Sequence, residues 1–393
     1  MITVVHVSDI HFKSDYGRDN AFDLGKRVGS AASTEVDPKG EVFVVVSGDI
    51  AYSGKEDEYA IAARFLHGLA EEIQVRRGRK VPTFVIAPGN HDCDHSLNST
   101  ARQALIESPK LADPDSASIE LCLLVQKHFL KFRSVLSVKV PRFKEISPTV
   151  EQGEVDTGQT TICFQIINTA WASQKDEVYG HLTMPDAMLN DNLGATNTDV
   201  VVSILHHPYS WFEQNHRRNL RRYVEASSDM VLTGHEHYAD VSMISRRGGI
   251  RAQYIEGGIL SGNVEGEAST FNIVLLDADG KRYKCKTYAD DGTGQYSEVS
   301  ASEWQEYVKN AGRLRLEFEL NGDYCNYLSS AGVQYTHPHK PDVNLTDVYV
   351  PPTLREKSVD DGEKYEPELY TDLPGLAGSK GRLLVIGAEK SGK

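Results

Sequence analysis

The chain has 393 residues, of which 40% are hydrophobic and 25% charged, and its formal net charge is −14. This length favours two or three domains, and the composition is that of a globular protein with enough apolar residues for a sizeable core. The negative charge disfavours non-specific attraction to nucleic acid or to an anionic membrane as the main activity. A local exception is the basic segment HRRNLRRY at 216–223.

The cysteines and the N-terminal sequence predict the cellular compartment. The five cysteines are widely spaced and form no C-x-x-C pair, which favours reduced thiols over a disulfide framework. The opening MITVVHVSDIH lacks the basic and apolar regions of a signal peptide. No apolar run reaches the roughly 18 residues that a membrane helix needs. We therefore expect a cytoplasmic protein with no membrane partner.

Five short apolar runs in the first 240 residues each end abruptly in polar residues. They are ITVVHVSD (2–9), EVFVVVSGD (41–49), TFVIAPGNHD (83–92), VVVSILHH (200–207) and DMVLTGHEH (229–237). Near-continuous Val, Ile and Leu is typical of strands buried on both faces. A stretch of helical composition follows the first run, and 56–73 has apolar residues at helical spacing. This order predicts a layered α/β domain whose site lies where the strands end.

The rest of the chain is predicted more coarsely. The segment from about residue 93 to residue 140 is predicted to be a helical insertion, and its clearest helix is expected at 119–136. Further strands are expected at 160–171, at 250–260, and in a hairpin around the D-G turn at 279–280. The first domain is therefore predicted to close near residue 300. The polar, Pro-containing region 301–379 indicates a linker with some helix.

The polar residues at the ends of these strands are the main candidates for chemistry. They are Asp9, His11, Asp49, Asn90, His91, His206, His207, His235 and His237. One His after a strand has little meaning, but five strands that each deliver His, Asp or Asn to one edge are hard to attribute to chance. In D-x-H and H-x-H, residues i and i+2 of an extended segment point to the same side, so each pair can bind metal from one direction. Carboxylate, imidazole and amide donors without thiolate favour Mn, Fe, Zn or Mg.

The sequence blocks D-x-H, G-D, G-N-H-D, H-H-P and G-H-x-H, in this order, resemble the calcineurin-like metallophosphoesterase superfamily. They stand at 9–11, 48–49, 89–92, 206–208 and 234–237. The resemblance is nearest to the bacterial cyclic-nucleotide phosphodiesterase branch. It implies an α/β fold of the four-layer αββα sandwich type, with the helical insertion and a C-terminal linker added.

The resemblance also implies a centre of two divalent metal ions that hydrolyses phosphate esters. Its ligands would form two groups joined by a bridging carboxylate: Asp9, His11 and His237; Asn90, His206 and His235; and the bridging Asp49. A hydroxide between the ions would attack phosphorus in line. We expect Mn²⁺ or an Fe/Mn pair, with Zn²⁺ and Mg²⁺ as alternatives.

Four further roles concern residues near the metal ligands. The resemblance places His91 at the leaving group, as general acid or charge stabiliser, and Asp92 as the residue that orients it. His207 is a candidate for substrate binding, with a structural place as the alternative. Arg217 and Arg218 are candidates for binding the substrate phosphate, with a solvated helix face as the alternative.

Several functions remain open at this stage. The first is a phosphodiesterase that acts on a nucleotide or another small diester. The second is a nuclease, which the arginine cluster favours and the net charge disfavours. The third is a scaffold without activity, which the intact ligand set makes the weakest alternative. Specificity is expected in the loops 93–140 and 208–225.

The C-terminal sequence GRLLVIGAEKSGK predicts a different domain. A buried strand at 382–387 leads into G-x-x-x-x-G-K, with Gly387, Gly392 and Lys393 as candidate nucleotide-binding residues of a Walker A loop. Together with VYVPPTLRE it resembles the start of a STAND or NACHT ATPase module. We therefore expect 380–393 to begin a P-loop NTPase domain. The phosphoesterase would then be its effector, for example in defence against phage, and would oligomerise through that domain.

Overall fold

The computed structural model describes residues 1–307 except 79, 137–140, 159, 190–197, 246–250 and 261–267, together with 354–355 and 369–370. The chain forms two compact units, Met1–Leu316 and Glu317–Lys393. In the second unit the described residues form the paired strands β15 (Leu354–Arg355) and β16 (Leu369–Tyr370). The predicted strand at 382–387 and the Walker A residues lie outside the described residues.

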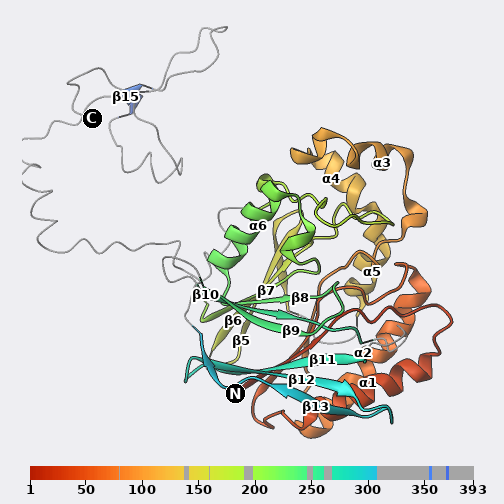
Figure 1. The fold of residues 1–393 in the computed structure, drawn as a ribbon, viewed down its shortest axis with the longest axis vertical. Helices are drawn as coiled ribbons and strands as arrows, with labels where there is room; N and C mark the ends of the chain where they lie inside the picture. The colour runs from red at the N-terminus through yellow and green to blue at the C-terminus, as the bar shows by residue number, and fades with distance from the viewer. Residues whose placement is uncertain are drawn as a thin grey trace, which may run out of the picture. The chain divides into compact units, whose positions relative to one another are not determined.

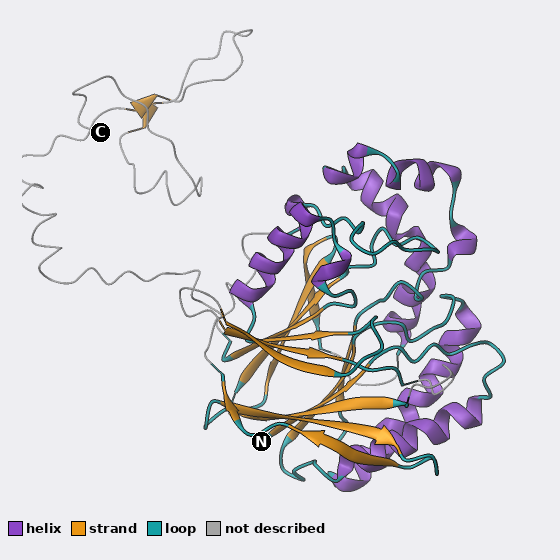
Figure 2. Ribbon diagram, viewed as in Figure 1, coloured by secondary structure: helices purple, strands orange, loops and turns teal. Residues whose placement is uncertain are grey.

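Two seven-stranded sheets form the centre of the first unit (Figures 1 and 2). The first has the order β13-β12-β11-β1-β2-β3, with β14 paired to β12. Its strands are β1 (Ile2–Val7), β2 (Glu41–Val46), β3 (Thr83–Ile86), β11 (Thr270–Asp277), β12 (Arg282–Asp290), β13 (Tyr296–Ala301) and β14 (Gln305–Glu306). β1, β2 and β3 are parallel, whereas β11 runs antiparallel to β1. β14 extends this sheet a few residues past the boundary predicted near residue 300.

The second sheet has the order β4-β5-β6-β7-β8-β10-β9. Its strands are β4 (Phe143–Ser147), β5 (Val150–Asp156), β6 (Thr161–Ile167), β7 (Val200–Ile204), β8 (Met230–Thr233), β9 (Asp240–Ser245) and β10 (Arg251–Glu256). β6, β7, β8 and β10 are parallel neighbours. The five apolar runs of the sequence are thus divided, three in the first sheet and two in the second.

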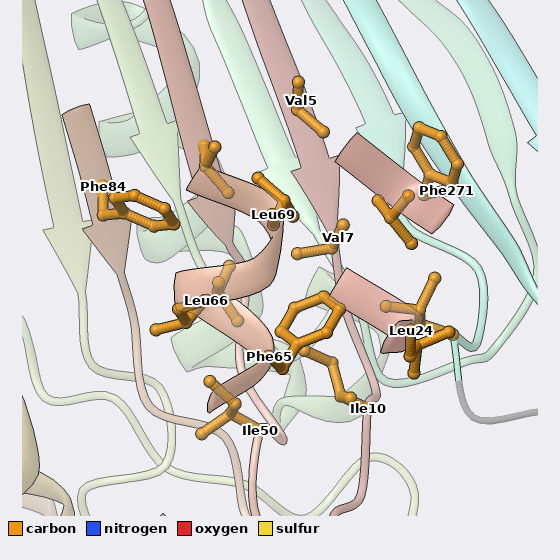
Figure 3. Packing of buried hydrophobic residues seen from close by; sticks show 14 of the residues in the cluster. Val5, Val7, Ile10, Leu24, Ile50, Phe65, Leu66, Leu69, Phe84 and Phe271 are labelled. Atoms are coloured by element: carbon orange, nitrogen blue, oxygen red, sulfur yellow. The ribbon is translucent and has the colours of Figure 1, made fainter. Parts of the chain in front are cut away.

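Helices cover the outer faces of both sheets (Figure 1). α1 (Arg18–Ser33) and α2 (Glu56–Arg76) pack on the first sheet, and Figure 3 shows Leu24 and Phe65 of these helices against Val5 and Val7 of β1. The alternate β1 residues, Ile2 and Val4, pack between the two sheets. α6 (Gln214–Ser227) covers the second sheet. These layers confirm the predicted αββα sandwich, and the two-residue period of β1 is the reason that one strand contributes to two cores.

The helical insertion connects the two sheets. It contains α3 (Thr100–Ile106), α4 (Ser116–Leu123), α5 (Lys127–Val135) and the short 3₁₀ turns His95–Leu97, Pro109–Ala112 and Leu124–Gln126. Two other 3₁₀ turns lie at Asp186–Met188 and Tyr209–Trp211. The sequence predicts a single helix at 119–136, but the 3₁₀ turn Leu124–Gln126 divides it into α4 and α5. At this turn the buried side chain of Gln126 donates to the carbonyl oxygen of Ala170 over 3.0 Å. No described helix is both long enough and apolar enough to cross a bilayer.

Candidate metal centre

The candidate residues lie in the loops that follow β1, β2, β3, β7 and β8, so both sheets contribute to one site. The loops after β1 and β2 are joined by a hydrogen bond from the backbone N–H of His11 to the carbonyl oxygen of Asp49. The two sheets are joined by the backbone N–H of His235, which donates to Oδ2 of Asp9 over 3.0 Å. Because strands of both sheets end here, polar residues separated by more than 200 positions in the chain come into contact.

The first group of ligand atoms comes from Asp9, His11 and His237. Oδ1 of Asp9 lies 3.8 Å from Nε2 of His11 and 3.6 Å from Nε2 of His237. The two imidazole Nε2 atoms are 3.4 Å apart. Three potential donors to a cation therefore converge on one point.

The second group comes from Asn90, His206 and His235. Oδ1 of Asn90 lies 2.9 Å from Nε2 of His206 and 3.1 Å from Nδ1 of His235. The two imidazole nitrogens are 3.2 Å apart.

Asp49 lies between the two groups. Its Oδ2 is 3.2 Å from Nε2 of His206 and 4.0 Å from Nε2 of His11. The arrangement has the form that two cations sharing one carboxylate require.

Polar atoms left without partners indicate that these residues fit metal ions. Oδ1 of Asp9 is buried and has no hydrogen-bond partner among the described residues. Buried polar atoms are otherwise almost always hydrogen-bonded, so an atom of this kind needs an explanation such as a bound ion. Carboxylate, imidazole and amide donors suit divalent cations such as Mn²⁺, Zn²⁺ or Mg²⁺.

Neighbouring backbone groups orient the ligand atoms. The Nδ1–H group of His206 donates to the carbonyl oxygen of Ser47 over 2.9 Å, which leaves Nε2 directed at the site. Asp49 binds the backbone N–H of His91 through Oδ1 over 2.8 Å, which leaves Oδ2 for the cluster. Contacts of this kind fix the tautomer and the orientation of metal ligands. Ser47 was not identified from the sequence, because its carbonyl oxygen, and not its side chain, makes this contact.

The backbone is strained at the same residues. Among the described residues, six that are not glycine have positive φ, and five of them are candidate ligands: Asp9 (51°), His11 (52°), Asp49 (54°), His235 (78°) and His237 (65°). Each such residue costs of the order of 1–3 kcal/mol unless its surroundings compensate, and such strain is concentrated at functional sites.

The positive φ angles correct the expectation that D-x-H and H-x-H are extended segments. Asp9 and His11 do reach the same group, but through left-handed turns. His235 and His237 reach different groups, one on each side of Asp49, as the family resemblance implied.

Two glycines are required by close packing against the carboxylates. A Cβ atom on Gly89 would lie 2.1 Å from Oδ1 of Asp49. A Cβ atom on Gly234 would lie 2.0 Å from Oγ of Ser8 and 2.8 Å from Oδ2 of Asp9. Any larger residue at either position would displace a candidate ligand.

The charges of His206 and Asp49 are coupled. Burial alone lowers the pKa of His206, but the Asp49 carboxylate outweighs burial and raises this pKa to about 10. Burial raises the pKa of Asp49, and His206 outweighs it and holds this pKa well below the ordinary value. In the metal-free protein the pair therefore holds a proton where a cation would bind.

His91 lies beside the first group, and its ring centroid is 4.6 Å from that of His11. Its Nδ1–H group donates to the carbonyl oxygen of Tyr52 over 2.7 Å. Since Nδ1 is occupied in this way, Nε2 is the ring atom that can exchange a proton with a substrate.

The role predicted for Asp92 is corrected by the structure. Asp92 is fully buried and has no hydrogen bond to the imidazole of His91, which Tyr52 orients instead. Its carboxylate accepts from the backbone N–H groups of Gly89, Ile50 and Ala51 and from the hydroxyl of Tyr59. Burial and then the charge of Asp49 raise the pKa of Asp92 to about 7. Asp92 thus joins the loops after β2 and β3 and is closed to solvent.

His207 also has a structural position, the alternative that its sequence left open. It is fully buried, its Nε2 lies 2.9 Å from Oε2 of Glu177, and its Nδ1 lies 3.0 Å from Oγ1 of Thr169. Both ring nitrogens are occupied, which leaves no polar atom for a substrate. The partner Glu177 could not be predicted from the sequence, because it lies 30 residues away.

The predicted phosphate-binding arginines are not part of the cluster. Arg217 and Arg218 are exposed on α6, and neither side chain contacts a described candidate ligand. The side chain that approaches His235 from this region is Trp211, whose ring centroid lies 4.1 Å from the imidazole. Trp211 donates from Nε1 to Glu236 over 2.8 Å. Arg217 and Arg218 therefore belong to a solvated helix face in this structure.

Comparison with solved structures gives weak resemblances. A dimetal phosphatase from Danio rerio is 15% identical with a TM-score of 0.41, and the match covers 77% of this chain and 99% of that one. A hypothetical protein from Thermus thermophilus is 15% identical with a TM-score of 0.35, covering 78% and 100%. Vps29 complexed with Zn²⁺ from Entamoeba histolytica is 12% identical with a TM-score of 0.29, covering 78% and 99%. No curated protein sequence gave a significant match.

Comparison with family models is more informative. The model of the calcineurin-like phosphoesterases matches residues 2–239, which is more than half of the chain. The matched region begins before Asp9 and ends after His237, so it contains every residue of the two ligand groups. The chain therefore belongs to the calcineurin-like phosphoesterase family, and it is a metal-dependent phosphoesterase.

Proposed function

We propose that the protein hydrolyses a phosphodiester, such as a nucleotide, at a centre of two divalent metal ions. The observation that carries the proposal is the pair of three-residue ligand groups with Oδ2 of Asp49 between them. Two cations in these positions would neutralise phosphoryl oxygens and lower the pKa of a bound water. Asn90 completes the second group without adding negative charge that would repel the substrate.

His91 supplies the proton in this proposal. Its Nδ1–H bond to the carbonyl oxygen of Tyr52 fixes the ring, and Nε2 can then donate to the leaving oxygen when the imidazole is protonated. The backbone N–H of the same residue holds Asp49 in place. One residue therefore connects the position of the bridging carboxylate to the position of the acid.

The space beside His91 can hold the organic group that leaves. A cavity of about 570 Å³ adjoins Asn90 and His91. A second cavity, of about 670 Å³, touches the cluster only at His237 and is otherwise lined mainly by residues of β9, β12 and β13. The choice of a diester over a monoester therefore depends on the comparison of chromogenic substrates.

The proposal is tested with purified protein and two chromogenic substrates, bis-p-nitrophenyl phosphate and p-nitrophenyl phosphate. With Mn²⁺ we expect kcat/KM to be higher for the diester. Asp49→Ala and His235→Ala should each reduce that value by about 10³-fold or more, because each removes a metal ligand. The proposal fails if neither substrate is hydrolysed with Mn²⁺, Zn²⁺ or Mg²⁺, or if both variants retain wild-type activity.

A nuclease activity is the second candidate. The exposed Arg217 and Arg218 of α6 favour it, since cationic side chains on one helix can bind a phosphate backbone. Incubation with plasmid and single-stranded DNA under the same conditions tests this candidate. Cleavage that Arg217→Met and Arg218→Met together weaken, while hydrolysis of the small diester persists, would support it. Control of the hydrolase by a following NTPase domain stays a prediction from the sequence.

A further inference from the structure

The cavity beside His91 is lined by two lysines in addition to residues of the metal centre. Its volume of about 570 Å³ is within the range of pockets that enclose whole small molecules. Asn90 and His91 form the wall nearest the metal centre. Lys55 and Lys175 line the same cavity from two different loops. The family resemblance assigns no role to either lysine.

The charge that this cavity presents is positive. Lys55 and Lys175 are exposed, and neither forms an ion pair with a described residue. The acid in the wall is Asp94, which is 5% exposed. Its Oδ1 accepts from the backbone N–H and the hydroxyl of Ser96, and its Oδ2 lies 3.5 Å from Nε2 of His128. Asp94 is thus engaged elsewhere, which leaves two ammonium groups for a ligand.

The loops that carry the two lysines are held in place by buried contacts. A Cβ atom on Gly54 would lie 2.5 Å from the backbone of Cys93 and Asp94, so the chain before Lys55 is seated directly on the cavity wall. On the other side, fully buried Arg102 donates to the carbonyl oxygen of Ser173 over 2.8 Å, two residues before Lys175.

Arg102 also donates to the carbonyl oxygen of Cys122, so the helical insertion holds this loop. Buried contacts of the fold therefore hold the walls of the cavity, which is not a gap between mobile surface side chains.

We infer that this cavity takes the leaving-group half of the substrate, and that this half carries a phosphate of its own, which Lys55 and Lys175 bind. The inference rests on the proposed function, in which Nε2 of His91 protonates the leaving oxygen. In that step the bond from phosphorus to the leaving oxygen breaks, and the oxygen of a water forms the new bond to phosphorus. The leaving oxygen takes its proton from Nε2 of His91. The proton that the attacking water loses passes to solvent, and His91 takes up a proton from solvent before the next turnover. The substrate is then a nucleotide diester with at least one further phosphate.

Two dinucleotides test the inference, dTpdT and its doubly phosphorylated form pdTpdTp. Whichever half of pdTpdTp leaves carries a phosphate, whereas neither half of dTpdT does. With Mn²⁺ we expect kcat/KM for pdTpdTp to exceed that for dTpdT by about tenfold, because charge-assisted contacts to phosphate are strong but these ammonium groups are partly solvated. The ratio should fall with added salt.

Substitution of the lysines shows whether they cause the preference. In the double variant Lys55→Met and Lys175→Met, the ratio should drop below about twofold, as expected when the charge-assisted contacts are lost. Bound metal and the unfolding midpoint, measured in parallel, show that the protein remains intact. Lys144→Met removes the same charge from an exposed position on β4 and should leave the ratio unchanged.

The outcomes separate the inference from the proposed function. If bis-p-nitrophenyl phosphate and both dinucleotides resist hydrolysis with every metal, the proposed function is refuted and the inference falls with it. If diesters are hydrolysed but pdTpdTp is not preferred, or if the double variant keeps the preference, the inference alone is overturned.

Discussion

Replacing Asp92 by Asn distinguishes a structural residue from a catalytic one. The amide has nearly the shape of the carboxylate, but one acceptor oxygen becomes an N–H donor. Oδ1 accepts from Ala51 N–H and the Tyr59 hydroxyl, and Oδ2 accepts from Gly89 N–H and Ile50 N–H. Either orientation of the amide therefore sets two buried donors against an NH₂ group.

The structure gives the expected size of the effect. Each buried donor left without an acceptor costs about 1–3 kcal/mol, so the variant should lose about 2–6 kcal/mol of unfolding free energy. The loss should be nearer the lower end if the NH₂ group takes the place of Oδ1. The Tyr59 hydroxyl also lies 3.1 Å from the backbone carbonyl oxygen of Asp92, so it keeps an acceptor in that case. Tyr59→Phe removes one of these hydrogen bonds and should cost about 1 kcal/mol.

Urea denaturation at pH 8 measures these losses. This pH lies above the pKa of about 7 of Asp92, so the wild-type group is an ionised acceptor. Because burial and Asp49 raise this pKa, the buried charge itself opposes folding at pH 8, and its removal offsets part of the loss, which should therefore lie toward the lower end of the range. Asp15→Asn, at an exposed position, is the matched control and should change stability by no more than about 0.5 kcal/mol. Wild-type stability of Asp92→Asn, combined with a kcat reduced by about 100-fold or more at full metal content, would refute the structural role.

Three other predictions concern the histidines of the site. His206→Ala should lose bound metal, as measured by elemental analysis. His207→Ala should retain its metal but lose about 3–5 kcal/mol of unfolding free energy, because Glu177 is left as an unpaired buried charge. Equal metal loss in both variants would contradict the assignment. His91→Ala should lower kcat by about 10²–10⁴-fold with bound metal unchanged, and a loss of metal would show that this residue is a ligand instead. Metal affinity should rise by about tenfold per pH unit between about pH 6 and 9. Asp49 raises the pKa of His206 to about 10, so a cation must displace the proton that His206 carries below that pH. An affinity measured by calorimetry that does not change with pH would exclude this linkage.

The strands, the layers and the identity of the polar residues at the strand ends could be predicted from the sequence. Runs such as VVHV and VFVVV form buried strands because continuous β-branched residues suit a sheet covered on both faces, and β1 and β2 lie where these runs stand. Glycines before polar residues mark the ends of the same strands. Local patterns of this kind are sufficient because they depend on the period of the backbone and not on distant partners.

Only the tertiary structure decided what each of these polar residues contacts. Asp92 stands next to His91 in the chain, yet its hydrogen bonds go to the loop after β2, and His207 stands next to His206 but pairs with Glu177. The left-handed turns at the ligands and the cavity with two lysines likewise depend on loops that pack together from distant parts of the chain. The physical reason is that adjacent residues on a sharp turn point in different directions, so sequence neighbours need not share a partner.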